Sequence, residues 1–231
     1  MSYTPLKSLL FSSIGRKVVI AIAGLTFFFF LIFHLLGNLI IILGSGHLFN
    51  AYSHALVSLG YLLYLVEIVL FVAFFFHFIL AAIITLKNSQ SRPYGYKMAK
   101  SAGGPSRETI SSRTMIYTGV VVLVFVVLHV ITFKYGPGIA QGYVTTLDGQ
   151  KVRDLYRLVI EVFKNKWFVI WYVFSMIFLG FHVRHAFWSA FQSLGANNQR
   201  WTPILFWVGT FFAFFLGIGF LLIPLWVYFV L

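Results

Sequence analysis

Five long apolar stretches occupy most of this 231-residue chain and constrain what it can fold into. Each reaches the roughly 20 residues that an α-helix needs to cross the hydrocarbon core of a bilayer, and their only charged residues are Glu67 and Arg184. Backbone amides and carbonyls must be paired in lipid, so such stretches fold as helices. We predict an all-α integral membrane protein, a single domain over residues 1–231, with helices at about 18–43, 56–86, 114–133, 167–194 and 203–231.

The composition excludes a soluble globular domain. Hydrophobic residues make up 60% of the chain and charged residues only 10%, whereas soluble domains carry about 25% charged residues. The chain has no cysteine, which excludes disulfides, thiolate zinc sites, cysteine-ligated iron–sulfur clusters and covalent c-type haem. Any redox centre held by this chain is therefore bound non-covalently through nitrogen or oxygen.

The positive charges predict how the chain is oriented in the membrane. Lys and Arg number 17 against five acids. The N-terminal segment, the loop at 87–113 and the turn at 195–203 together carry ten cations and only Glu108, whereas the loop at 134–166 on the other side carries six cations and three acids. By the positive-inside rule the N-terminus is cytoplasmic. The charge is thus explained by topology and anionic lipid, and we expect no nucleic-acid partner. Part of the outer loop, 151–166, is expected to form an amphipathic interfacial helix.

Five of the seven histidines lie inside predicted spans, and four of them place one histidine in each of the first four helices: His34, His77, His129 and His182. The fifth, His185, lies within a turn of His182. At about 1.5 Å per residue, His34 and His129 lie roughly 26 and 24 Å from the cytoplasmic ends of their helices, and His77 and His182 roughly 15 and 20 Å. The four residues therefore sort into an outer and an inner pair. In an up-down four-helix bundle, the members of each pair face each other across the core.

Two bis-histidine haem b groups fit this pattern better than the other uses of membrane histidines. Structural zinc needs four ligands at one level, and a proton relay would need more carboxylates than Glu67. Haem needs an axial nitrogen on each face, an apolar aromatic pocket and cations near its propionates; the chain supplies all three. Gly24, Gly119 and Gly180 could let helices or a flat macrocycle approach closely, although small residues in membrane helices are more often simple packing positions. A membrane histidine that only hydrogen-bonds a neighbouring helix is the alternative for each residue taken alone.

The order and spacing of several motifs resemble one family along essentially the whole chain. They are SIGRK at 13–17, FHLLGN at 33–38, FNAYSH at 49–54, Glu67 ahead of His77, SRTM at 112–115, LHV at 128–130, and FH at 181–182 leading into WSAFQSLG at 188–195. The chain resembles the single-subunit, five-helix, di-haem cytochrome b anchor of bacterial succinate:quinone oxidoreductases, the succinate dehydrogenase and fumarate reductase group.

The resemblance implies a function, cofactors and partners. It implies a cytochrome b subunit of the bacterial cytoplasmic membrane that binds two haem b through His34, His77, His129 and His182, and passes electrons to or from quinone, with menaquinone used by some relatives. It also implies two partner subunits on the cytoplasmic face, a flavoprotein and an iron–sulfur protein. This chain has neither a dinucleotide fingerprint nor cluster cysteines, so it does no dicarboxylate chemistry alone.

Other polar residues give more limited expectations. Glu67 is placed near the outer interface, where a carboxylate could exchange protons with quinone. Arg184 and His185 lie within a turn of His182 and could pair with a haem propionate, although Arg184 could instead snorkel to the interface. The basic cytoplasmic face, especially the loop at 87–113 with Lys97, Lys100 and Arg107, is expected to dock the iron–sulfur subunit, the alternative being a topology signal that faces lipid headgroups.

The helix start at Ser12, Ser13 and Arg16 could form a second quinone pocket, the alternative being a helix cap and a topology anchor. Two other functions also stay open from the sequence. One is the cytochrome b subunit of a hydrogenase or formate dehydrogenase. The other is a non-haem membrane transporter.

Overall fold

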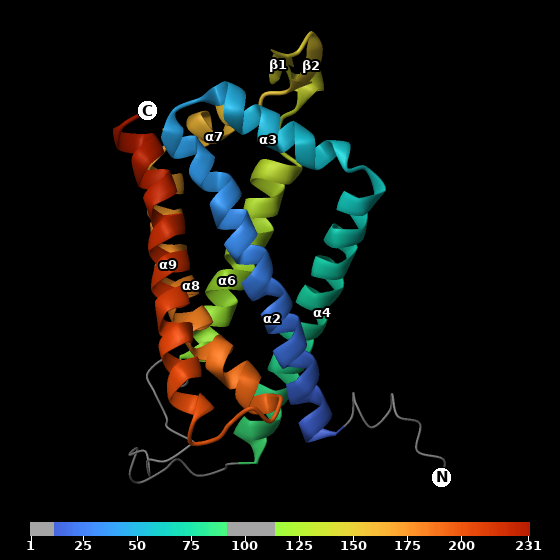
Figure 1. The fold of residues 1–231 in the computed structure, drawn as a ribbon, viewed down its shortest axis with the longest axis vertical. Coiled ribbons are helices and arrows are strands. Elements are labelled where there is room, and N and C mark those ends of the chain that lie inside the picture. Colours follow the sequence, from blue (N-terminus) through green and yellow to red (C-terminus); the bar gives the residue numbers. More distant parts are fainter. Residues whose placement is uncertain (1–11, 92–113) are drawn as a thin grey trace. The chain divides into compact units, whose positions relative to one another are not determined.

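The computed structural model describes residues 12–91 and 114–231, and five helices in this part of the chain are long and apolar enough to cross a membrane. They are α2 (Ser13–Asn38) continued by the 3₁₀ turn η1 (Leu39–Leu43), α4 (Tyr61–Gln90), α6 (Met115–His129) continued by the π-helical turn η3 (Val130–Lys134), α8 (Lys166–Ser193) and α9 (Trp201–Phe229) (Figure 1). The prediction of five apolar spans is confirmed.

The second predicted span, 56–86, begins too early. Residues 56–58 belong to a separate short helix, α3 (Gly46–Ser58), and Gly60, with φ +55°, separates it from α4. The side chain of Ser45 caps α3 by accepting a hydrogen bond from the Leu48 amide at 3.2 Å. The apolar run continues across the turn, so hydropathy alone does not mark this boundary.

The connection between the third and fourth spans contains a β-hairpin and a short helix. Strands β1 (Val144–Leu147) and β2 (Gln150–Arg153) pair antiparallel, and both turn residues, Asp148 and Gly149, have positive φ, as a tight hairpin turn requires. Helix α7 (Leu155–Phe163) follows and buries Leu158, Val159 and Phe163. The expected amphipathic helix is therefore present, but over fewer residues than 151–166.

The described residues divide into two compact units, each described here by itself. The first unit contains residues 12–30, 68–91, 114–118 and 181–213, and the second contains Leu31–Glu67, Gly119–Gly180 and Phe214–Leu231. In the first unit, Phe28 packs its ring against Phe187 at 4.7 Å and Phe212 at 5.0 Å between centroids. These rings connect α2, α8 and α9.

In the second unit, α3 and α7 lie side by side (Figure 1), and a buried asparagine joins them. Asn50 is 3% exposed. Its amide donates to Asp154 at 2.8 Å and its carbonyl oxygen accepts from the Tyr156 amide at 2.9 Å. Asp154 also caps α7 by accepting from the Arg157 amide at 3.0 Å. One side chain thus satisfies polar groups at the start of α7.

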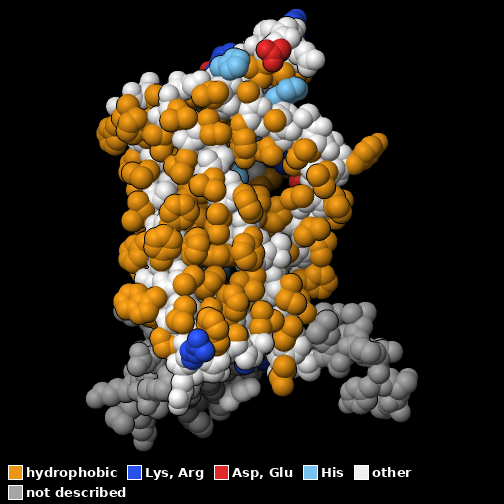
Figure 2. All heavy atoms as spheres, viewed as in Figure 1, with side chains coloured by type: hydrophobic (Ala, Val, Ile, Leu, Met, Phe, Trp, Pro, Cys, Tyr) orange, Lys and Arg blue, Asp and Glu red, His pale blue; other side chains and the backbone are white. Residues whose placement is uncertain are grey.

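The spans differ in how much they bury. Among the described residues, α4 buries only Leu80 and α6 only Thr118, whereas α8 buries a series that includes Val169, Tyr172 and Met176. On the face shown in Figure 2, hydrophobic side chains cover the membrane helices. An apolar surface suits contact with lipid tails, because these offer no hydrogen-bond partners to polar side chains.

Candidate functional site

The second unit brings His34 of α2 next to His129 of α6. Their ring centroids are 5.8 Å apart and the ring planes are nearly perpendicular, at 88°. The Asn38 amide nitrogen lies 3.4 Å from His34 Nδ1 and donates to the His34 carbonyl at 2.8 Å. His129 Nδ1 lies 3.1 Å from the Tyr172 hydroxyl. Both imidazoles thus have a polar neighbour at Nδ1: at His34 it is an amide NH2 group, which can only donate, and at His129 it is a hydroxyl, which can donate or accept.

Aromatic rings surround this pair. Phe125 stacks on His129 with centroids 5.4 Å apart, and Phe133 lies 5.3 Å from the same imidazole. Phe220 of α9 lies 5.7 Å from the His34 ring. The pair therefore has an apolar and aromatic environment of the kind in which a macrocycle such as haem is held.

The first unit brings His77 of α4 next to His182 of α8, with ring centroids 6.2 Å apart. His182 Nδ1 lies 3.2 Å from the Thr118 hydroxyl oxygen. That hydroxyl donates its only hydrogen to the Met115 carbonyl at 3.0 Å, so it can only accept from His182. The hydrogen therefore sits on Nδ1, which leaves Nε2 of His182 unprotonated and able to bind a metal.

His77 differs from the other three histidines. Its Nδ1 is buried and has no hydrogen-bond partner among the described residues. A side chain at Gly24 would begin 3.5 Å from His77 Cε1, so the glycine on α2 leaves room beside the imidazole. The His77 side chain also has a backbone hydrogen bond with Ile20 of α2.

The separation of the rings in both pairs fits two imidazoles on opposite faces of one metal ion. With metal–nitrogen distances of about 2.0 Å, the ring centres of such ligands lie roughly 6 Å apart. No group of three or more His, Cys, Asp or Glu within residues 12–91 and 114–231 is arranged to hold a metal. Each pair brings two imidazoles together and no further His, Cys, Asp or Glu within these residues.

Glu67, predicted to exchange protons with quinone, forms an ion pair with Lys134 in the second unit. Both side chains are partly exposed, at 31% and 41%. Lys134 ends the π-helical turn η3, in which the Tyr135 amide bonds to the Val130 carbonyl five residues earlier. This turn begins directly after His129, and π-helical turns are frequent at functional sites.

Arg184 and His185 lie in the first unit, on the same helix as His182. The Arg184 guanidinium lies over the Phe206 ring, 5.1 Å from its centroid. The His185 ring meets Trp188 edge-on at 6.0 Å, and its Nδ1 is buried without a partner among the described residues. Their expected role at a haem propionate stays a prediction.

The remaining predicted positions have simpler surroundings. Ser12 accepts a hydrogen bond from the Gly15 amide at 2.9 Å, as a helix-capping side chain does. Arg16 is 9% exposed. Nothing in the structure tests a quinone pocket there. The proposed docking residues Lys97, Lys100 and Arg107 lie outside the described residues.

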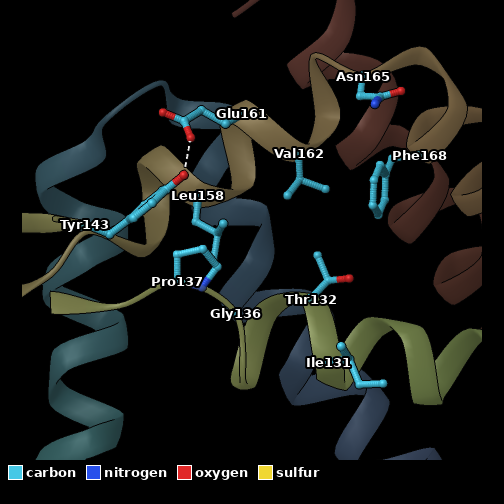
Figure 3. Close-up of a pocket in the computed structure, with 10 residues that line it drawn as sticks. All are labelled: Ile131, Thr132, Gly136, Pro137, Tyr143, Leu158, Glu161, Val162, Asn165 and Phe168. Atoms are coloured by element: carbon cyan, nitrogen blue, oxygen red, sulfur yellow. Dashed lines mark hydrogen bonds between the residues drawn. The ribbon is translucent and has the colours of Figure 1, made fainter. Parts of the chain in front are cut away.

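Several polar residues of the site escaped sequence reasoning. Thr118 and Tyr172 carry no signal in their spacing, because hydroxyl side chains in membrane helices usually bond their own helix. Tyr143 and Glu161 form the rim of a cavity shown in Figure 3. The Asp148–Gly149 pair, which follows the β-branched run at 144–146, could have predicted the hairpin beside Tyr143.

Comparison of the chain with protein-family models, curated proteins and solved structures finds no match.

Proposed function

We propose that this chain is the cytochrome b membrane anchor of a bacterial succinate:quinone oxidoreductase, which binds two haem b and connects an iron–sulfur subunit with membrane quinone. The observation that carries the proposal is the pairing of four membrane histidines. Each pair comes from two helices, and its ring separation, 5.8 or 6.2 Å, suits axial ligation of one iron.

When bound, haem b would supply a one-electron redox centre at each pair. The residues of the chain hold and orient it. His34, His77, His129 and His182 would hold it through their imidazole nitrogens. Thr118 accepts from Nδ1–H of His182, which fixes the tautomer and raises the basicity of the ligand nitrogen. The Tyr172 hydroxyl lies in the corresponding position at His129.

Charged residues of the first unit suit the acidic edge of haem. Arg184 and His185 follow His182 within one turn, and a guanidinium binds carboxylates with charge-assisted hydrogen bonds. In the part of the chain that the structure describes, the first unit contains no acidic side chain. A propionate there would meet no like charge from these residues.

The second unit contains the proposed proton-exchanging group. Quinone chemistry takes up or releases protons, and Glu67 belongs to the same unit as the His34/His129 pair. Glu67 is paired with Lys134, and a carboxylate at this place could exchange a proton with quinone. With the N-terminus cytoplasmic, this exchange would take place on the outer face.

Two steps of the proposed reaction, dicarboxylate oxidation or reduction and electron transfer through iron–sulfur clusters, would have to come from partner subunits. Without cysteines or a dinucleotide fingerprint, this chain needs a flavoprotein to react with dicarboxylates and an iron–sulfur subunit to carry electrons between them. The basic cytoplasmic segments would dock the latter.

A pyridine haemochrome assay on the purified chain tests the proposal. We expect two haem b per chain and co-purification of a flavin-containing subunit. Two haems with a different partner enzyme would indicate a hydrogenase or formate dehydrogenase type of subunit. The absence of haem would refute the cytochrome assignment and favour a transporter.

A further inference from the structure

A cavity of about 390 Å³ lies in the second unit, where the third span ends against α7 and the start of α8 (Figure 3). This volume is within the range of small-molecule sites, roughly 300–1,000 Å³. Much of its lining is apolar and comes from Ile131, Pro137, Leu158, Val162 and Phe168. Ile131 belongs to the third span and is 57% exposed, so the lining includes surface that would face lipid. A lipid molecule can therefore reach the cavity from the membrane.

One end of the cavity offers hydrogen-bond acceptors. Tyr143 donates its hydroxyl hydrogen to Glu161 at 2.5 Å (Figure 3), so the phenol oxygen is left to accept. Glu161 accepts from Arg157 through its other oxygen at 2.7 Å. Each carboxylate oxygen has a second lone pair that these two bonds do not use. A ligand group with several N–H hydrogens fits this end.

The charge of Glu161 follows from the same contacts. The hydrogen bonds from Tyr143 and then from Arg157 hold the pKa of the Glu161 carboxyl below its usual range, so at neutral pH the group is a carboxylate. The Arg157 guanidinium offsets part of that negative charge. This end therefore selects a cation through directed hydrogen bonds more than through net charge, and a cation without N–H hydrogens is a poor match.

The other end of the cavity offers a hydrogen-bond donor. Asn165 lies on the far side of Val162 from Tyr143 (Figure 3), and its carbonyl oxygen accepts from the Trp167 amide at 2.9 Å. The Asn165 amide nitrogen makes no hydrogen bond within the described chain segments, so it can donate to an oxygen of a ligand.

Positive charge surrounds this donor. Lys164 and Lys166 flank Asn165 in the sequence, and both are exposed. Neither forms an ion pair with an acid among the described residues, where the acids at 67 and 161 pair with Lys134 and Arg157. Helix α8 begins at Lys166, so the positive end of its dipole lies here too. An anionic group suits this end.

A tryptophan marks the level of the charged end in the membrane. Trp167 is 68% exposed, and the Lys166 ammonium lies 5.3 Å from its ring centroid. Exposed tryptophans of membrane helices are enriched at the level of the lipid headgroups. The cavity thus combines polar ends at headgroup level with an apolar lining that reaches the third span, and a phospholipid has the same order of groups.

We propose that this cavity binds a phospholipid whose headgroup carries both a phosphate and a primary ammonium, as phosphatidylethanolamine does. The ammonium donates to Glu161 and to the Tyr143 oxygen. The phosphate accepts from Asn165 and lies among the charges of Lys164 and Lys166, while an acyl chain covers the apolar lining. A choline headgroup has no N–H hydrogen and a glycerol headgroup has no positive charge, so neither matches both ends. The site needs neither haem nor quinone and does not rest on the proposed function.

Native mass spectrometry of the delipidated full chain in detergent tests the proposal. The probes are dioleoyl phosphatidylethanolamine, phosphatidylcholine and phosphatidylglycerol. We expect the ethanolamine lipid to bind about tenfold more tightly than the other two. Equal affinities, or tightest binding of the glycerol lipid, would overturn the proposal. The soluble headgroup glycerophosphoethanolamine should bind far more weakly than the whole lipid, and equal binding would overturn the membrane source of the ligand.

Two variants test the ends of the cavity separately. Glu161→Gln replaces the carboxylate by an amide and should lower the affinity for the ethanolamine lipid about tenfold, to that for the choline lipid, which should not change. Asp148→Asn, at an exposed carboxylate of the hairpin turn, is the matched control and should keep the preference. Lys164→Gln combined with Lys166→Gln should weaken binding of all three lipids, whereas Lys151→Gln on β2 should not.

A further variant tests whether the lipid lies in the cavity. Val162→Trp fills the space and should abolish the preference for the ethanolamine lipid, while the circular dichroism spectrum, which reports folding, stays that of the wild type. A preference that persists in both Val162→Trp and Glu161→Gln would place the lipid elsewhere and overturn the proposal. The Glu161→Gln result decides alone if the tryptophan variant does not fold.

Discussion

The two units hold similar histidine pairs in different surroundings. In the second unit, His34 and His129 both have a polar neighbour at Nδ1, and aromatic rings lie against them. In the first unit, Thr118 fixes His182, but Nδ1 of His77 is buried without a partner among the described residues. The chain thus places a polar group at Nδ1 of both outer histidines, but in the inner pair only at Nδ1 of His182.

The units also differ in charge. Of the five acids in the chain, Glu67, Asp148, Asp154 and Glu161 belong to the second unit, and Glu108 lies outside the described residues. Proton exchange through a carboxylate is therefore restricted, within the described residues, to the second unit. The first unit offers cations such as Arg184 and Arg200 and suits anionic groups.

Replacing a histidine of one pair should have the largest effect. His182→Ala or His77→Ala should reduce the haem content from two to one per chain, because a bis-histidine site loses an axial ligand. His34→Ala or His129→Ala should remove the other haem. Pyridine haemochrome and redox titration measure this, with His47→Ala on α3 as the control that retains both. If His34 and His77 variants lost the same haem, the pairing would be wrong.

Glu67→Gln should sharply reduce quinone-linked turnover, because the amide keeps the size of the side chain but cannot take up a proton. Succinate oxidation with an artificial dye and both haem spectra should stay unchanged. Full quinone activity in this variant would contradict a role in proton exchange.

Thr118→Val should affect the first unit alone. It keeps the shape of the side chain but removes the acceptor for Nδ1–H of His182, and loss of such a partner typically weakens metal binding by 10–100-fold. Haem retention during detergent dilution measures the effect. Thr210→Val is the matched control, since the Thr210 hydroxyl bonds the Phe206 carbonyl of its own helix. Equal loss in both variants would indicate a general packing defect.

Asn50→Ala should destabilise the second unit without removing haem. The change leaves polar groups of Asp154 and Tyr156 unsatisfied, at a cost of about 1–3 kcal/mol, or roughly 2–4 °C in Tm for each kcal/mol. Thermal unfolding measures this. Ser58→Ala, on the same helix but exposed, should leave Tm unchanged, and an equal Tm in the two variants would argue against the α3–α7 link.

The smallest effect that we expect is on the pH at which the Glu161 carboxyl ionises. Its carboxyl pKa is lowered by the Tyr143 hydroxyl and then by Arg157, so the ionised form contributes stability above its unfolded pKa, and this is lost as pH falls through the lower folded value. In Tyr143→Phe the pKa should rise toward its usual range. Carboxyl NMR of the labelled protein in nanodiscs checks this; an unchanged pKa would remove Tyr143 as the main cause.

The spans and the four membrane histidines were predictable because lipid imposes length, apolarity and a cost on each ionisable residue. Helix directions then gave the pairs that the structure brings together. The boundary at Gly60 was not predictable from hydropathy, since the end of α3 and the start of α4 on either side of it are both apolar. Thr118, Tyr172 and Asn165 were missed because their roles depend on which hydrogen bonds each side chain makes in the folded chain. Residue spacing in the sequence does not show these hydrogen bonds.

The π-helical turn after His129 has a consequence for the register of the third span. A π turn holds one residue more than a regular turn, and each residue in an α-helix advances the side chains by about 100°. In a regular α-helix continued from His129, the same residues would each advance by about 100°, more than they do in the wider π turn, so their side chains would point in other directions. The wide turn therefore sets the direction in which Lys134 meets Glu67 and in which Ile131 and Thr132 meet the cavity.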